Sequence, residues 1–182
     1  MRYPEGHKAE MRASIVAHAA RALRRGGLTG VSIPALMKSA GLTHGGFYAH
    51  FESRDELVAE AVMAAAEATG ANVLSTGAGD LEAALRTYLS AEHVAHPEGG
   101  CVLAALGSEG RRQPAPVRKA FSRAAKGFVS LIDQQLRKRR RGSEPSDEAL
   151  LLSAQMIGAV VLARLFDDEA LAARLLEVTK RR

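Results

Sequence analysis

The fold is decided by residues 32–56, which read SIPALMKSAGLTHGGFYAHFESRDE. Ser32 is a preferred N-cap residue and Pro34 is tolerated in a first helical turn, so a short helix is expected to begin here and to end at Gly41. Thr43 can cap a second short helix. Two short helices that are joined by a tight, glycine-containing turn predict a helix-turn-helix.

The second short helix has an unusual composition for a surface helix. It presents no acidic residue, and it contains the adjacent pair Gly45 and Gly46. Each glycine costs about 1 kcal/mol relative to alanine in a helix interior. Close approach of the backbone to another molecule is a natural compensation for that cost. The alternative is an ordinary helical bundle in which two short helices meet at a glycine.

The rest of the chain reads as helices with short breaks. Apolar residues recur at spacings of three and four over residues 7–25, and Ser53 with Glu56 forms a capping box that predicts a helix toward Ala71. Further helices are expected over residues 81–95, 102–109, 117–136 and 147–166, and from Asp167 or Asp168 onward. Because no strand pattern is present, the sequence predicts an all-α protein of about nine helices.

The composition agrees with this class and excludes several others. The 182 residues are 47% hydrophobic and 25% charged, as in an ordinary globular protein. The single cysteine rules out a disulfide framework or a cysteine-based zinc site within this sequence. His93 and His96 have the spacing of a one-turn metal site, but no third ligand is evident. No metal, cofactor or catalytic motif is therefore predicted.

The N-terminal residues are polar, and no run of about 18 uninterrupted apolar residues is present. These features predict a cytoplasmic protein with no membrane partner. Residues 1–54 contain eight Lys and Arg against three Asp and Glu, whereas the remaining 128 residues contain seventeen of each. A local positive excess fits contact with phosphates, although an inconsequential surface imbalance explains it equally well.

Residues 30–33, 40–51 and 53–57 together resemble the DNA-binding segment of TetR/AcrR-type transcriptional repressors. The resemblance covers about residues 8–58 and is specific in order, spacing and residue type; Arg54 stands where that family commonly has lysine. It implies a DNA-binding domain over residues 1–54 and a ligand-binding and dimerisation domain over residues 55–182. It also implies a homodimer that binds a pseudo-palindromic operator in double-stranded DNA and is released by a small-molecule inducer.

The same resemblance assigns roles in DNA binding to matching positions. Side chains at the start of each short helix contact phosphates or base edges, and a glycine allows the backbone to approach the duplex. These positions are Ser32, Thr43, His44, Gly45, Tyr48, His50 and Arg54. Phe47 and Phe51 have the spacing of core residues instead.

The segment over residues 149–166 is apolar nearly all round and contains several small residues, so it is expected to be buried on most sides. We predict that one face of it meets a second subunit, together with the last helix. The predicted interface comprises Leu151, Ala154, Gly158, Val161, Leu162, Leu171 and Leu175. A purely intramolecular core helix is the alternative.

Large residues on the central helices are candidates for the lining of a ligand pocket, although apolar stripes are more often plain core. The candidates are Met63, Tyr88, Cys101, Leu103, Leu106, Phe121, Phe128, Gln155 and Met156. Gln155 stands out because an amide on an apolar helix needs a partner, which is either a ligand or a hydrogen bond in the core.

Cys101 follows Gly99 and Gly100 at the predicted start of a helix, where the helix dipole favours a thiolate. The stretch over residues 100–109 is similar to the corresponding region of N-ethylmaleimide-responsive repressors, which implies a cysteine that senses electrophiles or oxidants. The alternative is a small buried residue, as free cysteines usually are.

A second function class also fits much of this pattern. A helical protein that binds small molecules or acts as a scaffold, without binding DNA, would need neither a basic N-terminal third nor a glycine-rich exposed helix. Salt-dependent binding to promoter DNA distinguishes the two classes.

Overall fold

The computed structural model describes residues 5–29, 32–75, 80–137 and 144–181. Within these ranges the chain forms α-helices, one 3-10 helix and no strand. The elements are α1 (Glu5–Gly26), α2 (Ile33–Ser39), the 3-10 helix η1 (His44–Ala49), α3 (Arg54–Ser75), α4 (Leu81–Tyr88), α5 (Ala91–Ala95), α6 (Val102–Gly110), α7 (Ala115–Arg137), α8 (Asp147–Leu165) and α9 (Glu169–Arg181). The predicted all-α class is confirmed. Residues 30–31, 76–79 and 138–143, which fall between predicted helices, lie outside the described ranges.

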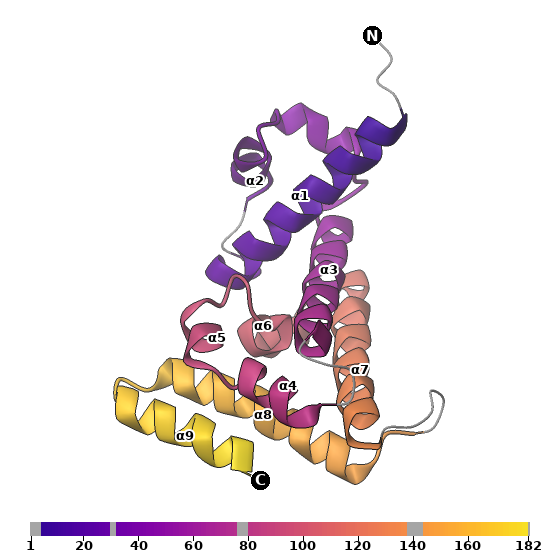
Figure 1. Cartoon of the computed structure of the whole chain (residues 1–182). Coiled ribbons are helices and arrows are strands. Elements are labelled where there is room, and N and C mark those ends of the chain that lie inside the picture. Colours follow the sequence, from indigo (N-terminus) through magenta and orange to yellow (C-terminus); the bar gives the residue numbers. More distant parts are fainter. Residues whose placement is uncertain (1–4, 30–31, 76–79, 138–143, 182) are drawn as a thin grey trace.

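Two long helices, α3 and α7, run side by side through the molecule (Figure 1). At one end, α1, α2 and η1 gather around the start of α3, and at the other end α8 packs against α9. The shorter helices α4, α5 and α6 lie between these two ends (Figure 1). We call α1, α2 and η1 with the first turns of α3 the head, and the remainder the body.

The described chain contains two hydrophobic clusters. The first is built from α1, α2, η1 and α3, and it continues into α6 and α7 through Leu106 and Phe121. The second joins α4, α6, α7, α8 and α9. The head is therefore packed directly on the body, because α3 begins at Arg54 and its buried face belongs to the first cluster. The division at residues 54 and 55 stays a prediction.

Most helix starts follow from local capping. The backbone N–H of Glu56 donates to Ser53 Oγ at 3.1 Å, and its carboxylate accepts from the backbone N–H of Glu52 at 2.7 Å. Ser146 accepts from the N–H of Ala149 at 3.2 Å in the same manner at the start of α8. These side chains satisfy N–H groups that have no partner inside a helix.

Two elements differ from the sequence-based expectation. The second short helix is a 3-10 helix, since two adjacent glycines weaken α-helical propensity and the segment is only six residues long. The helix expected over residues 81–95 is two helices, because Ser90 caps a new start by accepting from the N–H of His93 at 3.1 Å. This break turns α5 away from α4 and brings His93 into the interior of the body.

The packing of α6 on α7 can be tested at Gly110. A β-carbon at Gly110 would lie 2.8 Å from the Phe121 ring of α7, whereas one at Gly107 of the same helix would meet nothing within 4 Å. Gly110→Ala is therefore expected to lower the free energy of unfolding by about 1–3 kcal/mol. Gly107→Ala should raise it by about 0.5–1 kcal/mol through helix propensity. Urea denaturation measures both, and equal effects of the two variants would contradict the described packing.

Candidate functional site

The turn between α2 and η1 positions the recognition segment, which we define as residues 43–50. Gly41 has a φ of +74°, a backbone conformation that side chains disfavour, and the N–H of Leu42 donates to the Met37 carbonyl at 2.8 Å. Phe47 and Phe51 are buried and stacked with ring centroids 5.5 Å apart. These contacts anchor one side of η1 in the head and leave its other side outward.

The outward side of η1 carries the predicted contact residues. Tyr48 is 67% exposed and stands edge-on to the buried Phe47 ring at 5.2 Å. Thr43 and Gly45 are exposed, and a β-carbon at Gly45 would meet nothing within 4 Å. The backbone of His44 belongs to η1, but its side chain lies outside the described part of the structure.

Of three predicted phosphate-binding side chains, two make hydrogen bonds inside the head and the third is half-buried. Ser32 Oγ accepts from the N–H of Ala35 at 3.4 Å and so caps α2. Arg54 donates to the carbonyl of Leu28 and ties α3 to the end of α1. His50 is half-buried; its Nδ1 is buried without a hydrogen-bond partner, and burial lowers the pKa of the ring. A phosphate contact from His50 would therefore use Nε2.

Some basic side chains of residues 1–54 make contacts inside the protein. Arg12 hydrogen-bonds to Glu56 at 2.7 Å and to Glu60, and it lies 4.2 Å from the centroid of the Phe51 ring. Arg24 is buried. The local excess of charge thus overstates the charge available to a DNA-facing surface.

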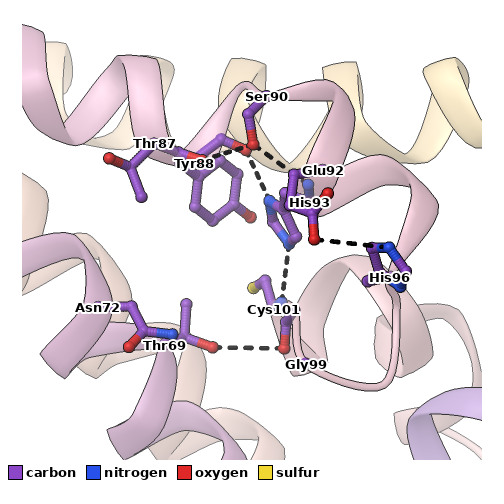
Figure 2. A pocket seen from close by; sticks show the side chains of 11 residues that line it. Thr69, Asn72, Thr87, Tyr88, Ser90, Glu92, His93, His96, Gly99 and Cys101 are labelled. Carbon is purple, nitrogen blue, oxygen red and sulfur yellow. Dashed lines mark hydrogen bonds and ion pairs between the residues drawn. The ribbon is translucent and has the colours of Figure 1, made fainter.

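A cavity of about 270 Å³ lies in the body between α3, α4, α5 and the turn before α6 (Figure 2). Its lining is mixed, with hydroxyl, amide, imidazole, thiol and carboxylate groups. The lining residues are Thr69, Asn72, Thr87, Tyr88, Ser90, Glu92, His93, His96, Gly99, Gly100 and Cys101. We call it the first cavity.

A hydrogen-bonded histidine organises the first cavity. His93 Nδ1 lies 2.6 Å from the Tyr88 carbonyl, which can only accept, so Nδ1 carries the proton. His93 Nε2 is therefore unprotonated and accepts from the backbone N–H of Cys101 at 2.9 Å (Figure 2). Burial lowers the pKa of His93, which agrees with a neutral ring. The imidazole thus links the end of α4 to the start of α6.

Gly100 also lines the first cavity, and it connects this cavity to the head. Its carbonyl accepts from Arg24 Nη1 of α1 at 2.6 Å and from Thr69 Oγ1 of α3 at 3.5 Å. A β-carbon at this position would lie 2.4 Å from the His93 ring, so only glycine permits the observed approach. The other end of α6 is also attached to the head, because Glu109 accepts from the backbone N–H of Leu28 at 3.0 Å.

A second cavity of about 230 Å³ lies between α3, α6 and α7, and its lining is largely apolar. Thr69 and Cys101 line both cavities, so the two hollows adjoin at these side chains. Cys101 itself is 2% exposed and is the N-cap residue of α6.

The structure brings five of the nine predicted pocket residues to these two cavities, and it places the other four elsewhere. Tyr88 lines the first cavity, Met63, Leu103 and Phe128 line the second, and Cys101 lines both.

Leu106 and Met156 are packed within the hydrophobic clusters, and Phe121 faces a separate open groove beside Gly110. Gln155 requires a correction, since it is exposed on the outer side of α8 and borders neither cavity. An apolar helix without a clear period does not reveal which side faces outward.

His93 and Gly100 were not among the predicted pocket residues. The adjacent glycines at 99 and 100 were the available signal, because paired glycines before a helix indicate close approach of another group. The sequence does not show that the approaching group is His93, which lies eight residues before Cys101.

The outer side of α8 and α9 exposes a row of apolar side chains. Leu151 and Leu162 of the predicted interface are 61% and 46% exposed, and a β-carbon at Gly158 would meet nothing within 4 Å. Ala154 and Leu171 are also exposed, whereas Val161 and Leu175 are half-buried. Three further exposed residues extend this outer face: Leu150, Leu165 and Val178. Large exposed apolar side chains on a pair of packed helices are typical of an interaction site.

One described helix, α8, is long and apolar enough to cross a membrane, and 39% of its apolar stretch is buried inside the protein. Core helices of soluble proteins pass the same test, so this feature is weak evidence for a membrane span.

Comparisons with known proteins agree across the chain. Residues 15–61 match the family model of bacterial regulatory proteins of the tetR family, and residues 77–179 match that of the tetracyclin repressor-like C-terminal domain. No curated protein matches the chain.

Among solved structures, the reduced form of Escherichia coli NemR is similar with a TM-score of 0.77 at 20% identity, covering 94% of each chain. A TetR-family transcriptional regulator from Agrobacterium tumefaciens has a TM-score of 0.73 at 19% identity and covers 96% of this chain and 98% of its own. At these identities the likeness shows a shared fold.

The pH dependence of stability tests whether His93 is neutral in its bridge between Tyr88 and Cys101. Because the folded-state pKa of His93 is lowered, the unfolded chain takes up this proton at higher pH than the folded chain does. This histidine therefore reduces stability as the pH falls through about 6.5, until the folded-state pKa is reached. A glutamine can accept from Cys101 and donate to Tyr88 without titrating.

His93→Gln should therefore lose less stability than the wild type between about pH 7 and pH 5. Thermal unfolding of the wild type and of His93→Gln across that range measures the difference. Parallel curves for the wild type and His93→Gln would contradict a buried neutral histidine.

Proposed function

Because the chain belongs to the TetR family of bacterial regulatory proteins, it is a DNA-binding transcriptional regulator rather than an enzyme, and we propose that it represses its targets as a homodimer. The observation that carries the proposal is the exposed Tyr48 on a glycine-rich helix whose other side is fixed by Phe47 and Phe51. Regulators of this family bind operator DNA as dimers and respond to small-molecule ligands. The protein acts in the cytoplasm under this proposal.

In the proposed complex, η1 of each subunit enters the major groove of a pseudo-palindromic operator. Thr43 and Tyr48 reach base edges or the sugar-phosphate wall, with His44 beside them, and the open surface at Gly45 lets the backbone approach. Ser32, His50 and Arg54 lie closer to phosphates. Two heads about 34 Å apart would read successive turns of one duplex face.

The second subunit covers the outer face of α8 and α9. Exposed leucines there have no partner side chains in one described chain, and burying them gains roughly 25 cal/mol for each Å² removed from water. The half-buried glycine at position 158 permits close contact between two α8 helices. Gln155 lies on this outer side as well, where an amide can pair across the interface.

The inducer occupies the body cavities beside Cys101 in this proposal. A ligand that displaces His93 would act on Gly100, whose carbonyl holds Arg24 of α1. Modification of the Cys101 thiol is the second route that the same position supports, since this side chain lines both cavities. At 2% exposure, a reagent would have to enter the cavities to reach it.

The DNA-binding proposal is tested with oligonucleotides that the wild-type protein enriches from genomic DNA. Tyr48→Ala should weaken binding to the enriched site by about 1–3 kcal/mol if the ring meets bases. Fluorescence anisotropy at two salt concentrations measures this loss, and Glu82→Ala on the distant helix α4 is the control. Arg54→Ala is a less suitable variant, because it also removes the link to Leu28. Recovery of no enriched site would favour the alternative of a helical binding or scaffold protein.

The dimer is tested at Gly158. Leucine at this position meets no neighbouring atom near its β-carbon within one chain, so its bulk acts mainly on the contact between subunits. Gly158→Leu should weaken the dimer by about 1–3 kcal/mol, which is roughly tenfold or more in the dissociation constant. Sedimentation equilibrium measures the shift. Gly127→Leu, at an open glycine of α7, is the matched control, and a wild type that is monomeric at micromolar concentration overturns the proposal.

A further inference from the structure

The first cavity is bordered by a hydroxyl that has no strong acceptor. Tyr88 is 2% exposed, and its hydroxyl has no oxygen or nitrogen partner among the described residues; its neighbour is the Cys101 thiol, which accepts only weakly. The ring is held between His93 and Phe128, with centroids 4.6 and 5.3 Å away, and its hydroxyl points toward the space beside His93 and Cys101 (Figure 2). Buried polar groups in folded proteins are nearly always paired, so this hydroxyl indicates a missing strong acceptor.

The hydroxyl stays protonated and therefore remains a donor. Burial and the neighbouring Cys101 thiol raise the pKa of Tyr88 well above its ordinary value. The other ring that faces this space, His93, uses both nitrogens in the bridge between Tyr88 and Cys101. A stronger acceptor than the Cys101 thiol, such as a ligand oxygen, would therefore come from outside the described residues.

The positively charged side chains of Arg24 and Arg164 lie near the side of the first cavity that Tyr88 and Cys101 form. Arg24 donates to the carbonyls of Ala20 and Gly100, and Arg164 donates to the carbonyls of His93 and Val94. Arg164 Nη1 is buried without a partner among the described residues. None of these hydrogen bonds uses a carboxylate, and Glu98 acts on both guanidinium groups only through space, so their charges are only partly compensated.

The acidic side chains near this side of the cavity are closer to solvent. Glu98 pairs with Arg25 at 3.4 Å and lies 3.6 Å from His96, and Glu92 lies 3.5 Å from His96 at the outer rim. A negative charge that reaches the Tyr88 hydroxyl would therefore sit on the positive side of the cavity. A cation in the same place would face two guanidinium groups.

We propose that the first cavity binds a small apolar carboxylate, whose carboxylate accepts from Tyr88 Oη and whose hydrocarbon part extends past Cys101 into the second cavity. The apolar lining of the second cavity by Met63, Leu103 and Phe128 suits an aryl or short alkyl chain. Both hollows are small relative to ordinary ligand sites, which span roughly 300–1,000 Å³. This inference rests on the proposed inducer site and names its ligand class.

The probes are matched compounds that differ only in the polar group: 3-phenylpropanoate, 3-phenylpropanamide, 3-phenylpropan-1-ol and 3-phenylpropylamine, with octanoate and octylamine as an alkyl pair. Isothermal titration calorimetry on the full-length dimer at neutral pH measures each affinity. The carboxylates should bind about tenfold or more tightly than the alcohol, because hydrogen bonds to charged groups are the stronger ones. The amines should show no binding at the same concentrations.

The variant that isolates the contact is Tyr88→Phe, which removes only a hydroxyl without a strong acceptor. It should keep the melting temperature of the ligand-free protein at or above the wild-type value and weaken carboxylate binding about tenfold. Arg86→Gln, which removes an exposed cation from the same helix α4, should bind carboxylates as the wild type does.

The outcomes separate this inference from the proposed function. Operator binding by the ligand-free wild type tests the regulator itself. If operator binding is intact but amines or alcohols bind as well as carboxylates, or no carboxylate binds, the ligand class is wrong. Unchanged carboxylate affinity in Tyr88→Phe also overturns it. If the ligand-free wild type binds no operator, the proposed function fails whatever the calorimetry shows.

Discussion

The contact on which the rest of the structure depends is the approach of the His93 ring to the backbone of Gly100. The ring lies where a β-carbon would otherwise be, and from there it accepts the N–H of Cys101 at the first turn of α6. The carbonyl of the same glycine faces the other way and accepts from Arg24 and Thr69. One residue therefore joins α4 and α5, α6, the DNA-binding head and the long helix α3. A backbone carbonyl is well suited to this role because it accepts two hydrogen bonds while adding no bulk.

The polar groups at this junction are costly to bury, and the surroundings explain how they are tolerated. Arg24 is nearly inaccessible, and burial lowers its pKa, as it does for Arg164. Arg24 donates to the carbonyls of Ala20 within α1 and of Gly100 before α6. Arg164 donates to the carbonyls of His93 and Val94 in the last turn of α5, where backbone carbonyls lack intrahelical partners. Removing Arg164 would take this donor from both carbonyls of α5. The positive side of the first cavity is thus a structural requirement before it is a binding surface.

Local sequence signals predicted the parts of this architecture that local physics controls. The cap at Ser53 and the turn at Gly41 involve residues at most five positions apart, so a short stretch of sequence contains the whole interaction. The outward position of Gln155 on α8 was not predictable, because the nearly uniform hydrophobicity of this helix has no helical period. The internal contacts of His93 and Arg54 were not predicted for a different reason. The partners of His93 are Gly100 and Cys101, and that of Arg54 is Leu28; turns and packing that a pattern of residue types does not encode bring them near.

The placement of α6 explains how a change in the body could reach the recognition segment. This nine-residue helix is attached to the end of α1 at both of its ends, through Gly100 to Arg24 and through Glu109 to Leu28. Leu28 is in turn tied to the first residue of α3 by Arg54, so the end of α1 and the start of α3 move together. A ligand shifts such a system only if it binds the two arrangements with different affinity. A ligand in the first cavity lies beside the bridge from His93 to Cys101, so an arrangement in which this bridge were broken and the first turn of α6 released would bind that ligand with a different affinity.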